Sequence, residues 1–145
     1  MIQGFFERLL GTAGTPPTDA DARLALTALL VRVARADFSY DAVEQAQIDA
    51  IITRRYALSP EGTKTLRLEA EQLEAEAPDT VRFTRAIKDA VPYEERIAVV
   101  EALWSVVLAD AERDEHEDAL LRMVANLLGV SDRDSNLARQ RAAGA

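Results

Sequence analysis

Two groups of acidic residues are the side chains of this sequence whose types and spacing could do chemistry. The segment "LADAERDEHEDALLRM", residues 108–123, holds six carboxylates and the only histidine of the chain. Three of its acids recur earlier in the sequence at a constant separation: Asp37 matches Asp110, Asp41 matches Asp114, and Glu44 matches Glu117. Clustered carboxylate oxygens suit hard divalent cations, so these six residues are candidate ligands for Ca²⁺, Mg²⁺ or Mn²⁺.

Helix initiation is a second explanation for four of these acids. Both repeats read Asp-x-x-Glu, at 41–44 and at 114–117, which fits the capping box at the start of a helix. Capping does not explain Asp37 and Asp110, because each falls in the last turn of the preceding helix, where a carboxylate is unfavourable by about 0.3–1 kcal/mol. These two acids either accept backbone hydrogen bonds in the turn or face a cation, and the sequence leaves both alternatives open.

Better-known metal and catalytic motifs do not fit the acids. Asp110, Glu112 and Asp114 mimic the first ligands of an EF-hand, but Glu115 replaces its glycine and Leu121 replaces its bidentate glutamate. An EF-hand is therefore excluded.

Zinc sites and nucleophilic catalysis also lack support. His116 is the only histidine, and its counterpart in the other repeat is Val43, so we expect His116 at the surface. The chain has no cysteine, which excludes disulfides and thiolate chemistry and fits a reducing compartment. A di-metal carboxylate bundle would supply Glu-x-x-His pairs, whereas Arg113 stands three residues before His116.

The segments that carry the acids read as amphipathic helices, and so does the rest of the chain. Apolar residues recur at three- and four-residue spacing, and prolines and glycines mark the ends of these runs. Expected helices cover about 19–36 and 42–56, begin after Ser59, Asp79, Pro92 and Ser131, and end at Gly129 in the helix that precedes the last. We therefore predict an all-α, single-domain bundle of about seven helices over residues 18–145, preceded by a short amphipathic helix and linker at 1–17.

The match between the two acidic segments extends to the apolar residues around them. Leu26, Leu30, Val33, Ile48 and Ile51 align without a gap with Val99, Leu103, Val106, Leu121 and Val124. This pattern predicts two related helix–turn–helix halves, at about 22–58 and 95–131. The predicted core comprises Leu26, Leu30, Val33, Ile48, Ile51, Leu103, Trp104, Val107, Val124 and Leu127.

Charge and hydropathy exclude several partners. The net charge of −8 argues against nucleic-acid binding, which needs clustered Lys and Arg. No apolar run approaches the ~20 residues of a membrane span. The alternative to docking of residues 1–11 on the core is a weak anchor to a membrane or to a partner. We favour docking because Arg8 is the only basic residue of this segment.

The repeated arrangement of an apolar helix, Ala-Asp, a short turn and an acidic helix start resembles the tellurite-resistance TerB family of small all-helical bacterial proteins. The motifs are "ARADFSYDAVEQAQIDAI" and "LADAERDEHEDALLRMVANLLGV", and the resemblance covers roughly residues 24–131. Asp37, Glu44, Asp110 and Glu117 fall on acidic positions of the family pattern. Where that pattern has glycine after the aspartate, this chain has Phe38 and Ala111.

The resemblance implies a cytoplasmic stress-response setting, binding of a divalent cation by the acids, and a role in protein–protein interaction without established enzymatic activity. Two functions from different classes follow. The first is a non-catalytic helical module that binds a protein partner and whose acidic turns could hold a cation. The alternative is a metal-dependent enzyme that uses the two carboxylate clusters, and the lack of Glu-x-x-His pairs favours the module.

Overall fold

Six helices form most of the part of the chain that the structure describes. This computed structural model describes residues 19–35, 40–76, 84–85, 87–89, 91–109 and 115–144, with side chains described from residue 23 on and not for 109 or 115–118. The helices are α2 (Asp19–Arg35), α3 (Ala42–Tyr56), α4 (Pro60–Glu76), α6 (Tyr93–Ala109), α7 (Glu115–Leu127) and α8 (Asp132–Gly144). The fold is all-α as predicted, and no strand occurs among the described residues.

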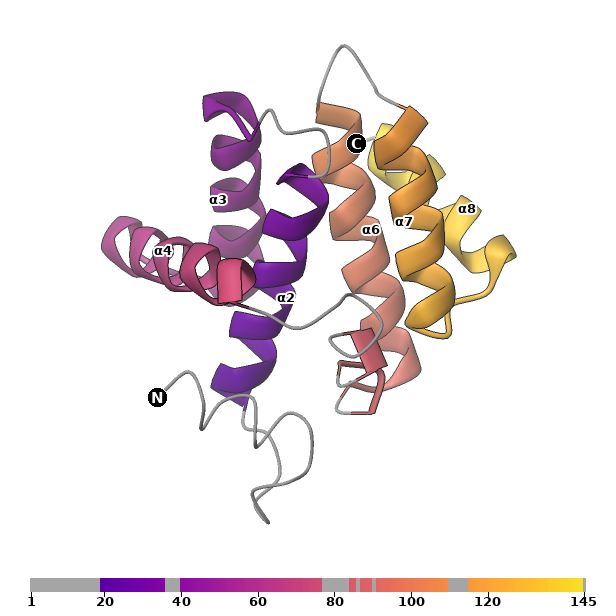
Figure 1. Cartoon of the computed structure of the whole chain (residues 1–145), viewed down its shortest axis with the longest axis horizontal. Coiled ribbons are helices and arrows are strands. Elements are labelled where there is room, and N and C mark those ends of the chain that lie inside the picture. The colour runs from indigo at the N-terminus through magenta and orange to yellow at the C-terminus, as the bar shows by residue number, and fades with distance from the viewer. Residues whose placement is uncertain are drawn as a thin grey trace.

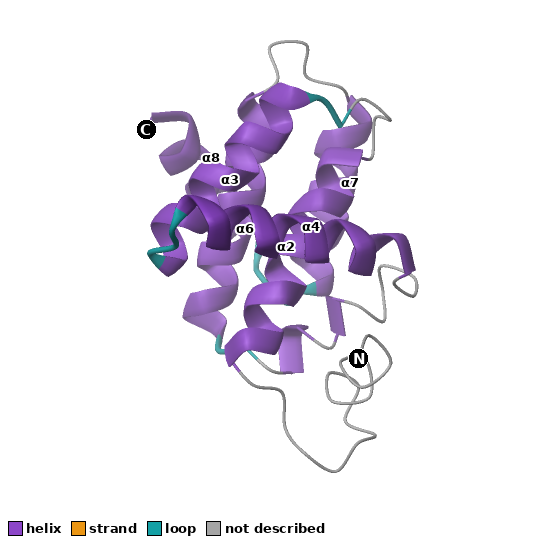
Figure 2. Ribbon diagram, turned by 90° about the vertical axis from the view of Figure 1, so that its left-hand side faces the viewer, coloured by secondary structure: helices purple, strands orange, loops and turns teal. Residues whose placement is uncertain are grey.

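Two antiparallel helix pairs, α2 with α3 and α6 with α7, form the centre of the bundle (Figure 1). The first helices of the pairs, α2 and α6, contact each other. A third helix packs on the first helix in each half, α4 on α2 and α8 on α6. In the view of Figure 2, α4 lies across the helices behind it. Each half therefore contributes three consecutive helices rather than the two that the sequence match covers.

The core lies where α2, α3, α6 and α7 meet. Eight of the ten predicted core residues are buried: Leu26, Leu30, Val33, Ile48, Leu103, Trp104, Val107 and Val124. The prediction was wrong for Leu127, which is only half-buried. Ile51 is also half-buried, although it packs against the core. Their neighbours Ile52 and Leu128 are fully buried instead. The buried stripe of α3 runs through residues 44, 48 and 52, so it is turned by one residue from the predicted stripe.

Serine hydroxyls begin the third helix of each half, as predicted. Ser59 Oγ accepts a hydrogen bond from Gly62 N–H at 3.0 Å, and Ser131 Oγ accepts one from Asp134 N–H at 3.1 Å. Each bond satisfies one of the backbone donors that a helix leaves free in its first turn.

The second helix of each half ends in the same backbone motif. At the end of α7, Val130 N–H donates to Ala125 O at 2.9 Å and Gly129 has a φ of 75°, which confirms the predicted glycine C-cap. At the end of α3, Leu58 N–H donates to Thr53 O at 3.2 Å. These ends are 72 residues apart, whereas the helix starts at Ala42 and Glu115 are 73 apart.

Some sequence predictions fall outside the described residues. These are the N-terminal helix and linker at 1–17 and most of the helix expected after Asp79, of which only 84–85 and 87–89 are described, as helix. Thr84 and Ile87 in that stretch are buried. In the part of the chain that is described, no helix combines the length and apolarity that a membrane span requires.

Candidate functional site

Asp41 caps the start of α3. Its backbone is extended, with φ −93° and ψ −178°, and its Oδ1 accepts a hydrogen bond from Glu44 N–H at 3.1 Å. Gln45 N–H donates to Asp41 O at 3.0 Å and begins the regular helical ladder. The capping role predicted for Asp41 is confirmed. The Asp41 side chain is exposed, so one of its faces remains accessible from solvent.

Glu44 differs from an ordinary capping glutamate because its side chain is buried, with 1% of its surface exposed. It stands one and two turns before Ile48 and Ile52, and these three residues form the buried stripe of α3. An ionised carboxylate taken out of water is destabilising by several kcal/mol unless a cation or hydrogen-bond donors compensate it. In a capping box the Glu44 backbone N–H donates to Asp41 and the Glu44 side chain can accept from the backbone N–H of Asp41, and neither bond requires this burial. Glu44 is thus the described acid that the capping explanation covers least well.

The helix ends that flank the other candidate ligands in the sequence lie together. In Figure 1 the C-terminal ends of α2 and α6 and the N-terminal ends of α3 and α7 all lie at the upper end of the molecule. Glu117 lies in the first turn of α7, but its side chain is not described. Asp37, Asp110 and Asp114 lie outside the described residues.

The structure therefore describes the side chains of only two of the six candidate ligands, Asp41 and Glu44. Among the described side chains, no group of three or more acids or histidines is placed to hold a metal ion. The two described ligand candidates belong to one end of α3, and their partners in the predicted set are the four acids just named. The cation site stays a prediction.

A polar cluster that sequence reasoning missed ties the start of α3 to α4. Tyr40, next to the cap residue, donates from its hydroxyl to Glu71 at 2.6 Å. Arg67 donates to Glu71 at 2.9 Å and to Asp49 of α3 at 2.7 Å. The guanidinium of Arg35 lies over the Tyr40 ring at 5.1 Å. Burial, together with the hydrogen bond to Glu71, raises the pKa of the Tyr40 hydroxyl far above its usual value.

A second contact ties the end of α2 to α4. Glu74 accepts from Arg35 at 2.9 Å and from Arg32 at 3.3 Å, and both arginines stand in the last turn of α2, where the helix dipole favours cations. One ion pair of these contacts could be predicted from the sequence, because Arg67 and Glu71 stand four residues apart on α4. Its extension across helices depends on how α4 packs. Together the two contacts hold α4 against α2 and α3.

Comparison with known protein families gives a match, which covers most of the chain. The family model described as "Tellurite resistance protein TerB" matches residues 23–140. No curated protein and no solved structure matches the chain significantly.

Proposed function

This chain belongs to the TerB family, whose model covers most of its length, and from that premise we propose that it is a non-catalytic helical module that binds a divalent cation at its acidic end. That end comprises the two helix–turn–helix corners, with Asp37, Asp41 and Glu44 at one corner and Asp110, Asp114 and Glu117 at the other. A protein partner would then bind this end of the molecule when the cation is present. The proposal assigns no reaction, because no Ser, His or Cys recurs beside the acids in both repeats.

The observation that carries the proposal is the burial of Glu44 at the start of α3. A divalent cation beside this carboxylate would favour its charged form and offset the cost of removing it from water. The same cation would reduce repulsion among the acids of the two corners. The proposal is supported by the four helix ends that flank these acids in the sequence, since all four lie at one end of the molecule (Figure 1).

Asp37 and Asp110 follow from the same argument. Both stand near the C-terminal ends of α2 and α6 in sequence, where the helix dipole disfavours a carboxylate. A bound cation would reverse the sign of that interaction. Oxygen-only ligands favour Ca²⁺, Mg²⁺ or Mn²⁺ over softer metals.

Thermal unfolding tests the proposal. A cation that binds the folded state with 100-fold excess over its Kd stabilises it by about 2.7 kcal/mol, which raises Tm by roughly 5–10 °C for a domain of this size. We expect Ca²⁺, Mg²⁺ or Mn²⁺ to raise Tm relative to EDTA, and Glu44→Gln to remove most of that rise.

Glu61→Gln is the matched control for this experiment. Glu61 also lies in the first turn of a helix, α4, but its side chain is exposed. It should keep the full cation-dependent rise in Tm. If no ion at millimolar concentration shifts the wild-type Tm, or if Glu44→Gln responds as the wild type does, the acids serve as helix caps and solubilising charge.

A further inference from the structure

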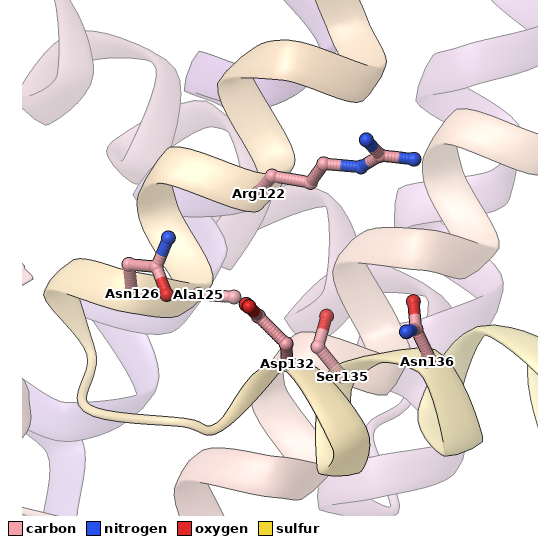
Figure 3. A pocket seen from close by; sticks show the side chains of 6 residues that line it. All are labelled: Arg122, Ala125, Asn126, Asp132, Ser135 and Asn136. Carbon is pink, nitrogen blue, oxygen red and sulfur yellow. The ribbon is translucent and has the colours of Figure 1, made fainter.

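A polar cavity of about 350 Å³ lies between the end of α7 and the start of α8, away from the acidic end of the molecule (Figures 1 and 3). Its lining consists of Arg122, Ala125, Asn126, Asp132, Ser135 and Asn136. Its volume falls at the small end of the range for ligand pockets. Four of the lining side chains are exposed and polar or charged, and none of the sequence predictions used them.

The charges of the cavity are separated. In Figure 3 the Arg122 side chain extends toward the side where Asn136 lies, whereas the Asp132 carboxylate points toward Ala125 and Asn126. Neither Arg122 nor Asp132 forms an ion pair with another described side chain. The cavity thus has a cationic side and an anionic side, each with an amide that can donate or accept hydrogen bonds.

Ser135 forms the buried floor between these two sides. Ser135 is 5% exposed, and its Oγ accepts a hydrogen bond from Trp104 Nε1 at 3.2 Å. The hydroxyl retains its own proton for donation. In Figure 3 the Ser135 Oγ points up from α8 toward the Arg122 side of the view. A buried donor at this place would bind an acceptor group of a ligand.

The corresponding place in the first half is filled by side chains that bind one another. Thr53 and Ala125 hold the same position in the terminal motifs of α3 and α7, and Thr63 and Ser135 each stand four residues after the serine cap. Thr53 Oγ1 and Thr63 Oγ1 hydrogen-bond at 2.6 Å. Ala125 has no hydroxyl, so in the second half that bond is lost and Ser135 faces the cavity.

The charged positions differ in the same way. Asp49, the counterpart of Arg122 at a separation of 73, forms an ion pair with Arg67 at 2.7 Å. The counterpart of Arg67 at a separation of 72 is Arg139, whose guanidinium lies over the Trp104 ring at 5.2 Å. Two arginines cannot reproduce that ion pair, which leaves Arg122 available to an external anion.

We propose that this cavity binds a small zwitterion, a molecule that carries one carboxylate and one ammonium group. Arg122 and Asn136 hold the carboxylate, the Ser135 hydroxyl donates to it, and Asp132 and Asn126 hold the ammonium group. A ligand with a single charge would engage only one of Arg122 and Asp132, so both charges contribute to selection. The site shares no residue with the acidic corners, so its test does not depend on whether a cation binds there.

The Trp104 indole N–H is a built-in probe for this site, because Trp104 is the only tryptophan and its N–H bonds the floor residue. We would follow its NMR resonance in the full chain during titration with glycine, β-alanine and γ-aminobutyrate, to about 10 mM, an excess for a millimolar Kd. At least one zwitterion should shift the resonance saturably. Acetate and ethylammonium, which carry one charge each, should give no saturable shift.

Three variants test the assignment of groups. Arg122→Gln and Asp132→Asn should each weaken binding about tenfold or more, the usual loss for a charge-assisted hydrogen bond. Ala125→Thr restores the hydroxyl of the first half and should close the cavity without removing a charge. Arg133→Gln changes an exposed arginine beside Asp132 that does not line the cavity, and it should bind as the wild type does.

Several results would overturn the proposal. One is a Trp104 resonance that no zwitterion shifts. Another is acetate acting as strongly as the amino acids, which would make this a simple anion site. A third is wild-type affinity in both Arg122→Gln and Asp132→Asn. These two side chains are exposed, so their variants remain informative even if Ala125→Thr does not fold.

Discussion

Ala57 and Gly129 occupy the same left-handed position at the ends of α3 and α7, with φ values of 52° and 75°. Each precedes a residue whose N–H closes the terminal motif of its helix, Leu58 in one half and Val130 in the other. Glycine adopts this conformation without steric cost, whereas the Cβ of alanine opposes it. The two halves therefore use the same backbone motif. Only the second half has glycine, the residue that favours this conformation, at the left-handed position.

This relationship predicts opposite effects of two exchanges. Ala57→Gly should raise the free energy of unfolding by about 0.5–1 kcal/mol, because the left-handed strain disappears. Gly129→Ala should lower it by about 1–2 kcal/mol, because an added Cβ is strained and would also lie 2.8 Å from Arg96 Nη1. Arg96 donates from that atom to Leu128 O, so it cannot move away without loss of a bond.

Urea unfolding of both variants, followed by circular dichroism, measures these differences. Gly144→Ala is the control, because an added Cβ there meets no atom within 4 Å. Destabilisation by Ala57→Gly would show that the end of α3 is not in the left-handed conformation.

The Tyr40–Glu71 hydrogen bond predicts how stability depends on alkaline pH. The folded protein holds the Tyr40 proton to higher pH than the unfolded chain does, because burial and Glu71 raise its pKa. The unfolded chain therefore loses this proton first, above about pH 10, and stability falls as pH rises beyond that value. Below it, the contribution is fully present.

Tyr40→Phe tests this linkage. It removes one side-chain hydrogen bond and should cost about 0.5–1.5 kcal/mol at pH 8. It should also make the decline in stability above pH 10 shallower than in the wild type. Tyr56, whose pKa burial also raises, would supply the slope that remains. An unchanged slope in Tyr40→Phe would contradict the hydrogen bond to Glu71.

Core packing gives a prediction with a matched surface control. Leu103 is fully buried in α6, whereas Leu68 of α4 is 48% exposed. Leu103→Ala should lower the free energy of unfolding by about 2–5 kcal/mol, and Leu68→Ala by less than about 1 kcal/mol. Chemical denaturation checks both. A loss below about half a kcal/mol at Leu103 would remove it from the core.

The sequence was sufficient for local features of the fold. The bounds of α3 agree with the prediction, as do the serine caps and the glycine at the end of α7, because these depend on residues within one turn of each other. The rotation of α3 was wrong by one residue. The predicted core took Ile51 from its match with Val124, whereas the structure buries Ile52 together with Glu44 and Ile48.

Features that join helices distant in sequence could not be predicted in the same way. The bonds from Arg67 to Asp49 and from Tyr40 to Glu71 depend on how α4 crosses α2 and α3. The cavity is lined by Ala125, which replaces the hydroxyl-bearing Thr53 of the first half. The effect of this difference could not be predicted without knowing that Ser135 of α8 lines the same cavity. Of the six predicted ligands, the structure places Asp41 and Glu44, and the shared site stays a prediction.

Paramagnetic broadening by Mn²⁺ tests the central claim most directly, because it locates the ion. Substoichiometric Mn²⁺ should broaden the backbone amide resonances of Asp41 and Glu44 and those at the start of α7, and excess Mg²⁺ or Ca²⁺ should restore them. The amides around Ser59 and Gly129, at the other ends of α3 and α7, should stay sharp. Broadening spread over all exposed acids, or none near Glu44, would contradict a cation site at the acidic end.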